Sequence, residues 1–125
     1  MKEDIKETLI SFQTAKLAKE IGIKYNDSYS DSFNSILPYL EDGSRRIDFN
    51  YDGEYYAACT QSLLQKYLRE EYNIIIEIQF DTISYGYRIF NPFKVSNYFT
   101  DWKYDKWEYE EALEEGLYNG LQLIK

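Results

Sequence analysis

The sequence contains no histidine, and this absence excludes several kinds of chemistry at once. Histidine is the commonest general base near neutral pH and the commonest protein ligand of transition metals. Ser-His-Asp and Cys-His catalysis are therefore excluded, as are zinc sites that use an imidazole. The single cysteine, Cys59, has no histidine partner, and we expect it to be a small buried residue at the end of a strand.

Disulfides, signal sequences and membrane spans are also missing from the pattern. One cysteine cannot form an internal disulfide, and residues 1–4 open into a charged segment that lacks the apolar stretch of a secretory signal. No run approaches the roughly 18 apolar residues of a membrane span. We therefore expect a soluble cytoplasmic protein with no membrane partner.

Basic residues are outnumbered, since 14 Lys and Arg stand against 22 Asp and Glu and give a net charge of −8. Nonspecific binding to a nucleic-acid duplex or to anionic lipid needs clustered positive charge, so both are disfavoured. Gly43, Gly53 and Gly86 stand alone and fit neither a P-loop nor a dinucleotide-binding fingerprint. A chain of 125 residues accommodates one domain, residues 1–125.

Three segments have helical periodicity. Ser11 is a good N-cap for a short helix that Gly22 closes, and Thr60 caps a second helix that Asn73 stops. Residues 108–124 form the third, in which two glycines four apart indicate close packing on the sheet or on another helix. The expected apolar positions of the three helices are Thr14, Leu17, Ala18 and Ile21, then Leu63, Leu64, Tyr67, Leu68 and Tyr72, then Leu113, Leu117, Leu121 and Ile124.

Two hairpins are predicted. Residues 46–51 and 54–59 flank Asp52-Gly53, a strong two-residue turn signal, which pairs Ile47 with Ala58 and Phe49 with Tyr56. Residues 74–80 and 83–90 form the second hairpin, with a tight connection at Asp81-Thr82 and Glu77 diagonal to Arg88. The predicted pairs of this second hairpin are Ile78 with Tyr85, Ile76 with Tyr87, and Ile74 with Ile89.

The expected fold is therefore α+β, with a small, mainly antiparallel sheet and three helices packed on it. Residues 95–100 are a candidate edge strand, and residues 25–39 show no clean period and are interpreted as a long ordered loop.

Acidic residues suggest two further sites, and the sequence argues against both. Residues 48–53 match the first half of an EF-hand loop, but its twelfth position is Cys59 and its flanks alternate as strands do. The four glutamates at 110, 111, 114 and 115 are expected to form a solvated helix face, with divalent-metal binding as a remote alternative. We predict no cofactor and no metal.

The surplus of aromatic residues is the most informative feature. Six of them lie between residues 98 and 109 among charged side chains, so not every ring can be buried. Tyrosine and tryptophan are typical anchors of binding surfaces, which makes Trp102, Tyr104 and Trp107 candidate binding residues. The alternative is that these rings cover a small core. The full cluster is Tyr98, Phe99, Trp102, Tyr104, Trp107 and Tyr109.

A second candidate binding element is Arg45 with Arg46, next to the glycine at 43. Two guanidinium groups at a turn are suited to a phosphate or a carboxylate. The alternative is a surface pair that balances Glu41 and Asp42.

Three segments, SFQTAKLAKE (11–20), QSLLQKYLRE (61–70) and YEEALEEGL (109–117), resemble a family of small uncharacterised proteins of gut Bacteroides-type bacteria and their phages. The resemblance covers the three helices and the isoleucine strand and implies no established activity. Many relatives have Trp in place of Tyr67 and a shorter, proline-containing hairpin region. A phage or mobile-element setting implies an accessory protein, in a bacterial or phage-infected host cell, that binds a host protein or a small signalling molecule.

We therefore predict a non-catalytic accessory protein that binds a host protein or a small nucleotide-like ligand through its aromatic surface. One alternative is a virion or self-assembling structural component, a homo-oligomer in which the exposed rings are subunit contacts. The other is an enzyme that depends on carboxylates or a metal.

Overall fold

The computed structural model describes residues 7–23, 37–46, 48, 50–92 and 102–125. These residues form an α+β fold, as the sequence predicts, with a small open antiparallel sheet. The helices are α1 (Phe12–Glu20), α3 (Gln61–Tyr72) and α4 (Tyr109–Gln122), and the strands are β1 (Ile75–Phe80), β2 (Tyr85–Phe90) and β3 (Lys103–Lys106).

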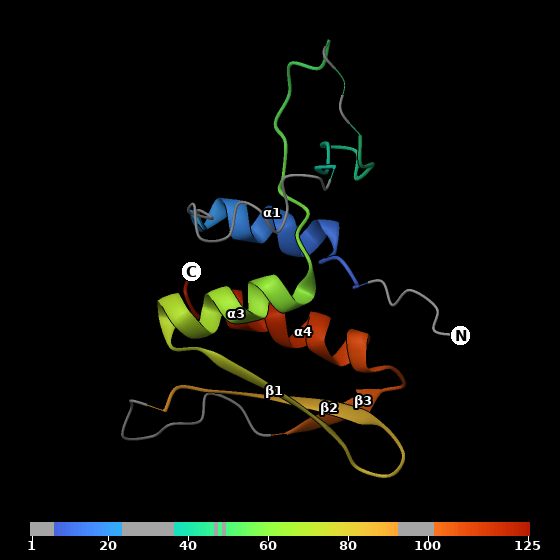
Figure 1. Cartoon of the computed structure of the whole chain (residues 1–125), viewed down its shortest axis with the longest axis vertical. Helices are drawn as coiled ribbons and strands as arrows, with labels where there is room; N and C mark the ends of the chain where they lie inside the picture. Colours follow the sequence, from blue (N-terminus) through green and yellow to red (C-terminus); the bar gives the residue numbers. More distant parts are fainter. Residues whose placement is uncertain (1–6, 24–36, 47, 49, 93–101) are drawn as a thin grey trace, which may run out of the picture.

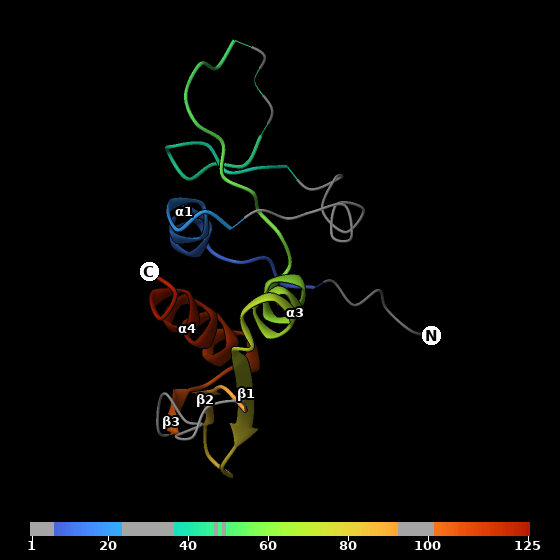
Figure 2. The same ribbon diagram turned by 90° about the vertical axis from the view of Figure 1, so that its left-hand side faces the viewer.

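The elements form three layers. The sheet has the order β1-β2-β3, and α4 lies against it with α3 at its side. Helix α1 packs on α4 from the side opposite to the sheet, so that α3 and α4 form the middle layer (Figures 1 and 2). The helices therefore lie on one face of the sheet, and the sheet's other face bears no described helix.

The helix ends follow their local signals. The Ser11 hydroxyl accepts a hydrogen bond from the Thr14 N–H, and the Thr60 hydroxyl accepts one from the Leu63 N–H. Asn73 ends α3 in the left-handed conformation, with φ of 56°. The predicted caps of the first two helices are thereby confirmed.

The register of the second hairpin differs from the prediction by two residues. Ile76 lies opposite Ile89 and Ile78 opposite Tyr87, because the connection takes the four residues 81–84 instead of two. A shift of two keeps every side chain on its predicted face, since strand side chains alternate with period two. Glu77 and Arg88 become direct neighbours instead of diagonal ones, and their side chains form an ion pair of 2.6 Å.

The first predicted hairpin is wrong. The backbone of Tyr56 exchanges both of its hydrogen bonds with Tyr39, at 2.8 Å each, and the predicted register would have committed them to Phe49. The Tyr51 N–H bonds to the Asp48 carbonyl at 3.0 Å, and the described part of 46–59 contains no strand. The candidate edge strand at 95–100 and most of the loop at 25–39 lie outside the described residues.

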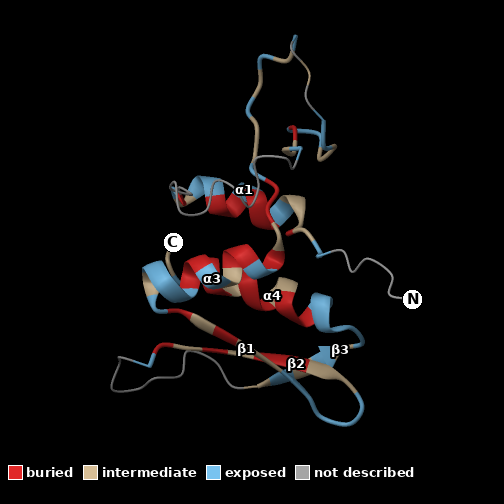
Figure 3. Cartoon of the chain, in the orientation of Figure 1, coloured by how far each residue is buried: buried red, intermediate tan, exposed pale blue. Residues whose placement is uncertain are grey.

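The core lies between the layers (Figure 3). Gly116 and Gly120 lie on the sheet side of α4, where a β-carbon on Gly116 would lie 2.7 Å from Cγ2 of Ile76. The predicted close approach is therefore confirmed. Cys59 is fully buried, as expected, although it precedes the N-cap of α3 and does not end a strand. The largest fully buried apolar side chains are Ile10, Leu40, Leu64, Leu68, Ile89, Leu117 and Leu121.

None of the helices in the described ranges has the length and the apolar character needed to cross a membrane.

Candidate functional site

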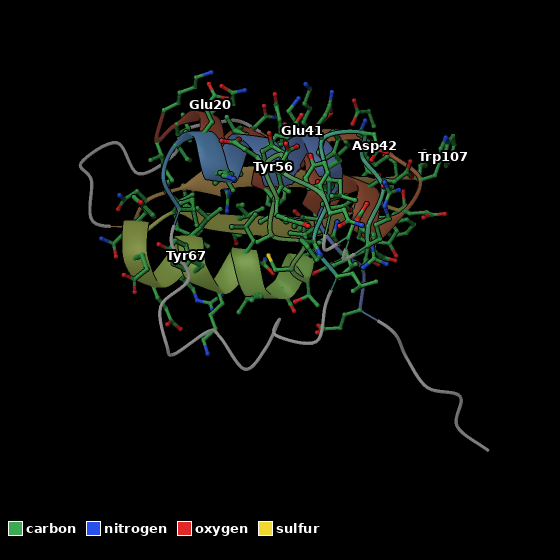
Figure 4. All side chains as sticks on the ribbon, turned by 90° about the horizontal axis from the view of Figure 1, so that it is seen from above. Glu20, Glu41, Asp42, Tyr56, Tyr67 and Trp107 are labelled. Atoms are coloured by element: carbon green, nitrogen blue, oxygen red, sulfur yellow. The ribbon has the colours of Figure 1, made fainter. Side chains whose placement is uncertain are left out.

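Exposed apolar side chains gather at one end of the sheet. Trp107 is 77% exposed, Ile83 71%, Phe80 52% and Tyr109 44%. Figure 4 shows Trp107 at the edge of the molecule, pointing away from its body. We call Phe80, Ile83, Tyr85, Trp107 and Tyr109 the aromatic end. Burying one such side chain contributes about 1.5–3 kcal/mol, so a cluster left in water is a candidate binding surface.

The sheet register brings these residues together. Tyr85 begins β2 and lies opposite Lys106, so the turn between β1 and β2 and the junction between β3 and α4 meet at one end of the sheet (Figure 1). The ring centroids of Phe80 and Tyr85 are 4.9 Å apart, and those of Tyr85 and Tyr109 are 6.0 Å apart in an edge-on arrangement. Three of the rings thus form a continuous series from β1 to the start of α4.

The turn at 81–84 holds Ile83 in its exposed position. One Asp81 carboxylate oxygen accepts hydrogen bonds from the N–H groups of Ser84 and Ile83, at 3.0 and 3.2 Å. These bonds, that of Ser84 above all, lower the pKa of Asp81, so the turn carries a negative charge at neutral pH. Ile83 therefore lies in the turn and not in the predicted strand.

A hollow of about 360 Å³ adjoins the aromatic end, between the start of α3 and the start of α4. Tyr109 lines it on the aromatic side, and its charged lining residues are Glu7 and Glu110, both exposed. Gln61 and Gln65 supply amide groups. The boundary of the aromatic end is therefore acidic on the α4 side as well as at Asp81.

Trp102 and Tyr104 do not join Trp107. Their rings stack on each other at 5.6 Å with an interplanar angle of 22°, and the Arg88 guanidinium lies 4.6 Å from the Trp102 ring. The Tyr104 hydroxyl donates to Oε1 of Gln79 at 2.9 Å. Both aromatic side chains are half-buried on the sheet face opposite to α4, outside the hydrophobic core and apart from Trp107.

Arg45 and Arg46 do not join the aromatic end. Both are exposed and belong to the segment 37–46, which lies on the side of α1 remote from the sheet (Figures 1 and 2). One Arg46 nitrogen lies 4.0 Å from the Asp42 carboxylate and donates to the Ser44 hydroxyl at 3.2 Å, which is the surface pairing named as the alternative. Hydrogen bonds from Ser44 lower the pKa of Asp42.

The glutamates of α4 are not a uniform solvated face, and that expectation is wrong for Glu114 and Glu115. The Glu114 carboxylate accepts hydrogen bonds from the Ser11 N–H at 3.0 Å, from the Thr14 hydroxyl, and from Nε2 of Gln61 at 3.0 Å. Thr14 and Gln61 are both buried. Glu114 therefore ties α1 and α3 to α4, a structural role that helical position alone did not indicate.

Glu115 belongs to a second polar cluster, between α4 and the sheet. Its carboxylate pairs with Nζ of Lys106 at 3.3 Å, and the hydrogen bond and charge of Glu115 raise the pKa of Lys106. Asn119 donates to the Tyr87 hydroxyl at 2.7 Å. Burial, and then the charge of Glu115, raises the pKa of Tyr87 to about 12.

No group of three or more histidine, cysteine, aspartate or glutamate side chains within the described ranges is arranged to hold a metal ion. Comparison of the chain with protein-family models, with curated proteins and with solved structures finds no match. The resemblance to the Bacteroides and phage family remains a prediction.

Of the residues at the aromatic end, the sequence singles out Trp107 but not Phe80, Ile83 or Tyr85. The predicted hairpin places Phe80 and Ile83 in paired strands, a position that does not indicate exposure. The signal that identifies them is Asp81 three positions before Ser84. The Asp81 side chain accepts a hydrogen bond from the Ser84 backbone N–H, which favours a four-residue turn over a two-residue one. With that turn in place, Ile83 lies outside the ladder.

Proposed function

We propose that this protein is a non-catalytic binding module that docks another protein at its aromatic end. The observation that carries the proposal is the exposure of Trp107 and Ile83, at 77% and 71%, beside a packed series of rings. Aromatic residues dominate the energetics of protein interfaces, and rings already held in position lose little conformational entropy on binding. A protein segment offers the area needed to cover several exposed side chains at once.

Charge favours a protein partner over a nucleotide-like ligand. Carboxylates at the aromatic end include Asp81 beside Phe80, and Glu7 and Glu110 in the hollow that Tyr109 lines, and carboxylates repel phosphate. Charge also opposes a second copy of the same chain, because each copy carries a net charge of −8. The aromatic end therefore supports docking of a different protein better than self-assembly.

The test is a selection of short random peptides on the immobilised full chain. Selected peptides are compared on wild type, on the double variant Trp107→Ala/Tyr109→Ala, and on the control Leu37→Ala/Leu123→Ala. The control removes exposed apolar side chains from positions outside the aromatic end, at 42% and 46% exposure. Removal of two aromatic anchors is expected to weaken the leading peptides at least about tenfold, and the control less than about twofold.

Peptides that bind wild type and the aromatic double variant equally would contradict the proposal. So would light scattering that shows a wild-type oligomer which the double variant loses, because the aromatic end would then be a subunit contact.

A further inference from the structure

We infer that the partner's docking segment is basic: it carries lysine or arginine next to a large apolar side chain. This inference rests on the proposed function and names the partner chemistry of the same surface. It is carried by the charges of the described residues around the aromatic end: Asp81, Glu7 and Glu110 are acidic, and Lys106 is paired with carboxylates of its own surroundings.

Acidic groups border the aromatic end on two sides. Asp81 lies in the turn between Phe80 and Ile83, and its hydrogen bonds to backbone N–H groups keep it ionised. On the α4 side, Glu110 and Glu7 are the charged groups of the hollow that Tyr109 lines. The Glu7 carboxylate accepts one hydrogen bond, from the Ser62 hydroxyl at 2.6 Å, and a carboxylate has lone pairs for several.

Lys106 directly precedes Trp107 and does not neutralise this end. Its ammonium lies 3.3 Å from Glu115 and 3.9 Å from Asp105. Its charge is thus matched by carboxylates of its own surroundings. The field at the aromatic end is therefore negative, and an approaching segment meets apolar rings between carboxylates.

A basic segment with an apolar anchor matches both features. Its apolar side chain covers the rings from Phe80 to Tyr109, and its cationic side chain enters the hollow of about 360 Å³ beside Tyr109. The lysine or arginine stem packs on the tyrosine ring while the charged head meets Glu7 and Glu110. An acidic segment would place like charges in contact, which costs affinity.

The selection of random peptides on the full chain also tests this inference, through the composition of the selected peptides and the dependence of their affinity on salt. Peptides that depend on the aromatic end are expected to be enriched in lysine or arginine beside an aromatic or aliphatic residue. Raising sodium chloride from about 0.1 M to about 1 M shortens the screening length from about 10 Å to about 3 Å. Their affinity should fall severalfold over this range, whereas the affinity of a peptide bound through apolar contacts alone would stay the same or rise.

Two charge-neutralising variants locate the effect. Glu7→Gln/Glu110→Gln keeps the size of both side chains and should weaken the selected peptides about 1.5- to 5-fold for each carboxylate removed. The control Glu20→Gln/Glu71→Gln removes the same charge from exposed positions at the ends of α1 and α3 and should leave affinity within about 1.5-fold.

The outcomes separate the two proposals. Selected peptides that depend on Trp107 and Tyr109 but are neutral or acidic would overturn the basic-partner inference and leave the proposed function standing. The same holds for selected peptides whose affinity changes neither with salt nor in the Glu7→Gln/Glu110→Gln variant. Selected peptides that do not depend on Trp107 and Tyr109 would overturn both the proposed function and the basic-partner inference.

Discussion

Gly116 of α4 lies directly over Ile76 of β1, so close that a β-carbon on the glycine would meet Cγ2 of the isoleucine at 2.7 Å. Alanine at position 116 gains about 1 kcal/mol in helix propensity but must displace a β-branched methyl group in the core. We expect Gly116→Ala to lower the free energy of unfolding by about 1–3 kcal/mol, measured by urea denaturation.

Gly120→Ala is the matched control. A β-carbon there would lie 3.3 Å from Cδ1 of Ile76, the movable end of that side chain. The substitution should therefore cost less than Gly116→Ala or be neutral. Equal costs at the two positions would contradict the packing described for α4.

Loss of the Glu114 carboxylate should destabilise the junction of the three helices. In Glu114→Ala the buried Thr14 hydroxyl loses its acceptor and Nε2 of the buried Gln61 loses one of its two, keeping the Glu110 carbonyl, which is expected to cost about 2–4 kcal/mol. Glu110→Ala, on the same helix but exposed, should cost less than about 1 kcal/mol. Thermal and urea unfolding of the two variants measure the difference. A stability loss for Glu114→Ala as small as that for Glu110→Ala would show that the Glu114 carboxylate is solvated, as the sequence predicts.

Truncation of the two tryptophans should affect the free energy of unfolding to different extents. Trp102 stacks on Tyr104 and lies 4.6 Å from the Arg88 guanidinium, so Trp102→Ala is expected to lower stability by about 1–3 kcal/mol. Trp107 is 77% exposed, and Trp107→Ala should stay within about 0.5 kcal/mol of wild type. A large stability loss at Trp107 would show that its ring belongs to the core and not to a binding surface.

Stability should fall in alkaline solution partly through Tyr87. Its pKa is raised to about 12 from a usual value near 10, so between these values the unfolded chain releases the phenol proton while the folded chain keeps it. The stability that Tyr87 contributes is thus complete below about pH 10 and is lost as the pH rises through about 12, by at most about 2.7 kcal/mol in total. Urea midpoints measured across this range should decline more steeply for wild type than for Tyr87→Phe, and parallel declines would contradict the assignment.

Local signals were sufficient to predict the helices. Ser11, Thr60 and Asn73 act on backbone groups within a few residues, and the apolar periodicity of each helix needs no distant partner. The strand faces were also predictable, because a register shift of two residues leaves alternation unchanged.

The errors arose where a distant partner or an unusual turn decides the structure. Tyr56 pairs with Tyr39, seventeen positions earlier along the numbering, although Asp52-Gly53 is locally a good hairpin turn. Strand β3 alternates Lys103 and Asp105 with Tyr104 and Lys106, a polar pattern that does not indicate a strand until β2 is there to pair with it. The hydrogen bonds of Glu114 likewise depend on α1 and α3, which sequence position does not reveal.

The predicted binding surface differs from the aromatic end because residues distant in the sequence decide which side chains lie together. The sequence grouped Trp102, Tyr104 and Trp107 because they are neighbours along the chain. The sheet separates them, since Tyr104 lies opposite Gly86 within the ladder while Trp107 follows the last residue of β3. The residues that accompany Trp107 come instead from the turn between β1 and β2, from the strand ends on either side of it, and from the start of α4.

The most direct test of the aromatic end as the binding surface is an NMR titration of the isotope-labelled full chain with a selected peptide. We predict that the largest shift changes fall on the Trp107 indole N–H and on the amides of Ile83, Tyr85 and Tyr109, with those of Arg45 and Arg46 unchanged. Largest changes at Arg45 and Arg46, or at Trp102 and Tyr104 with Trp107 unaffected, would contradict it.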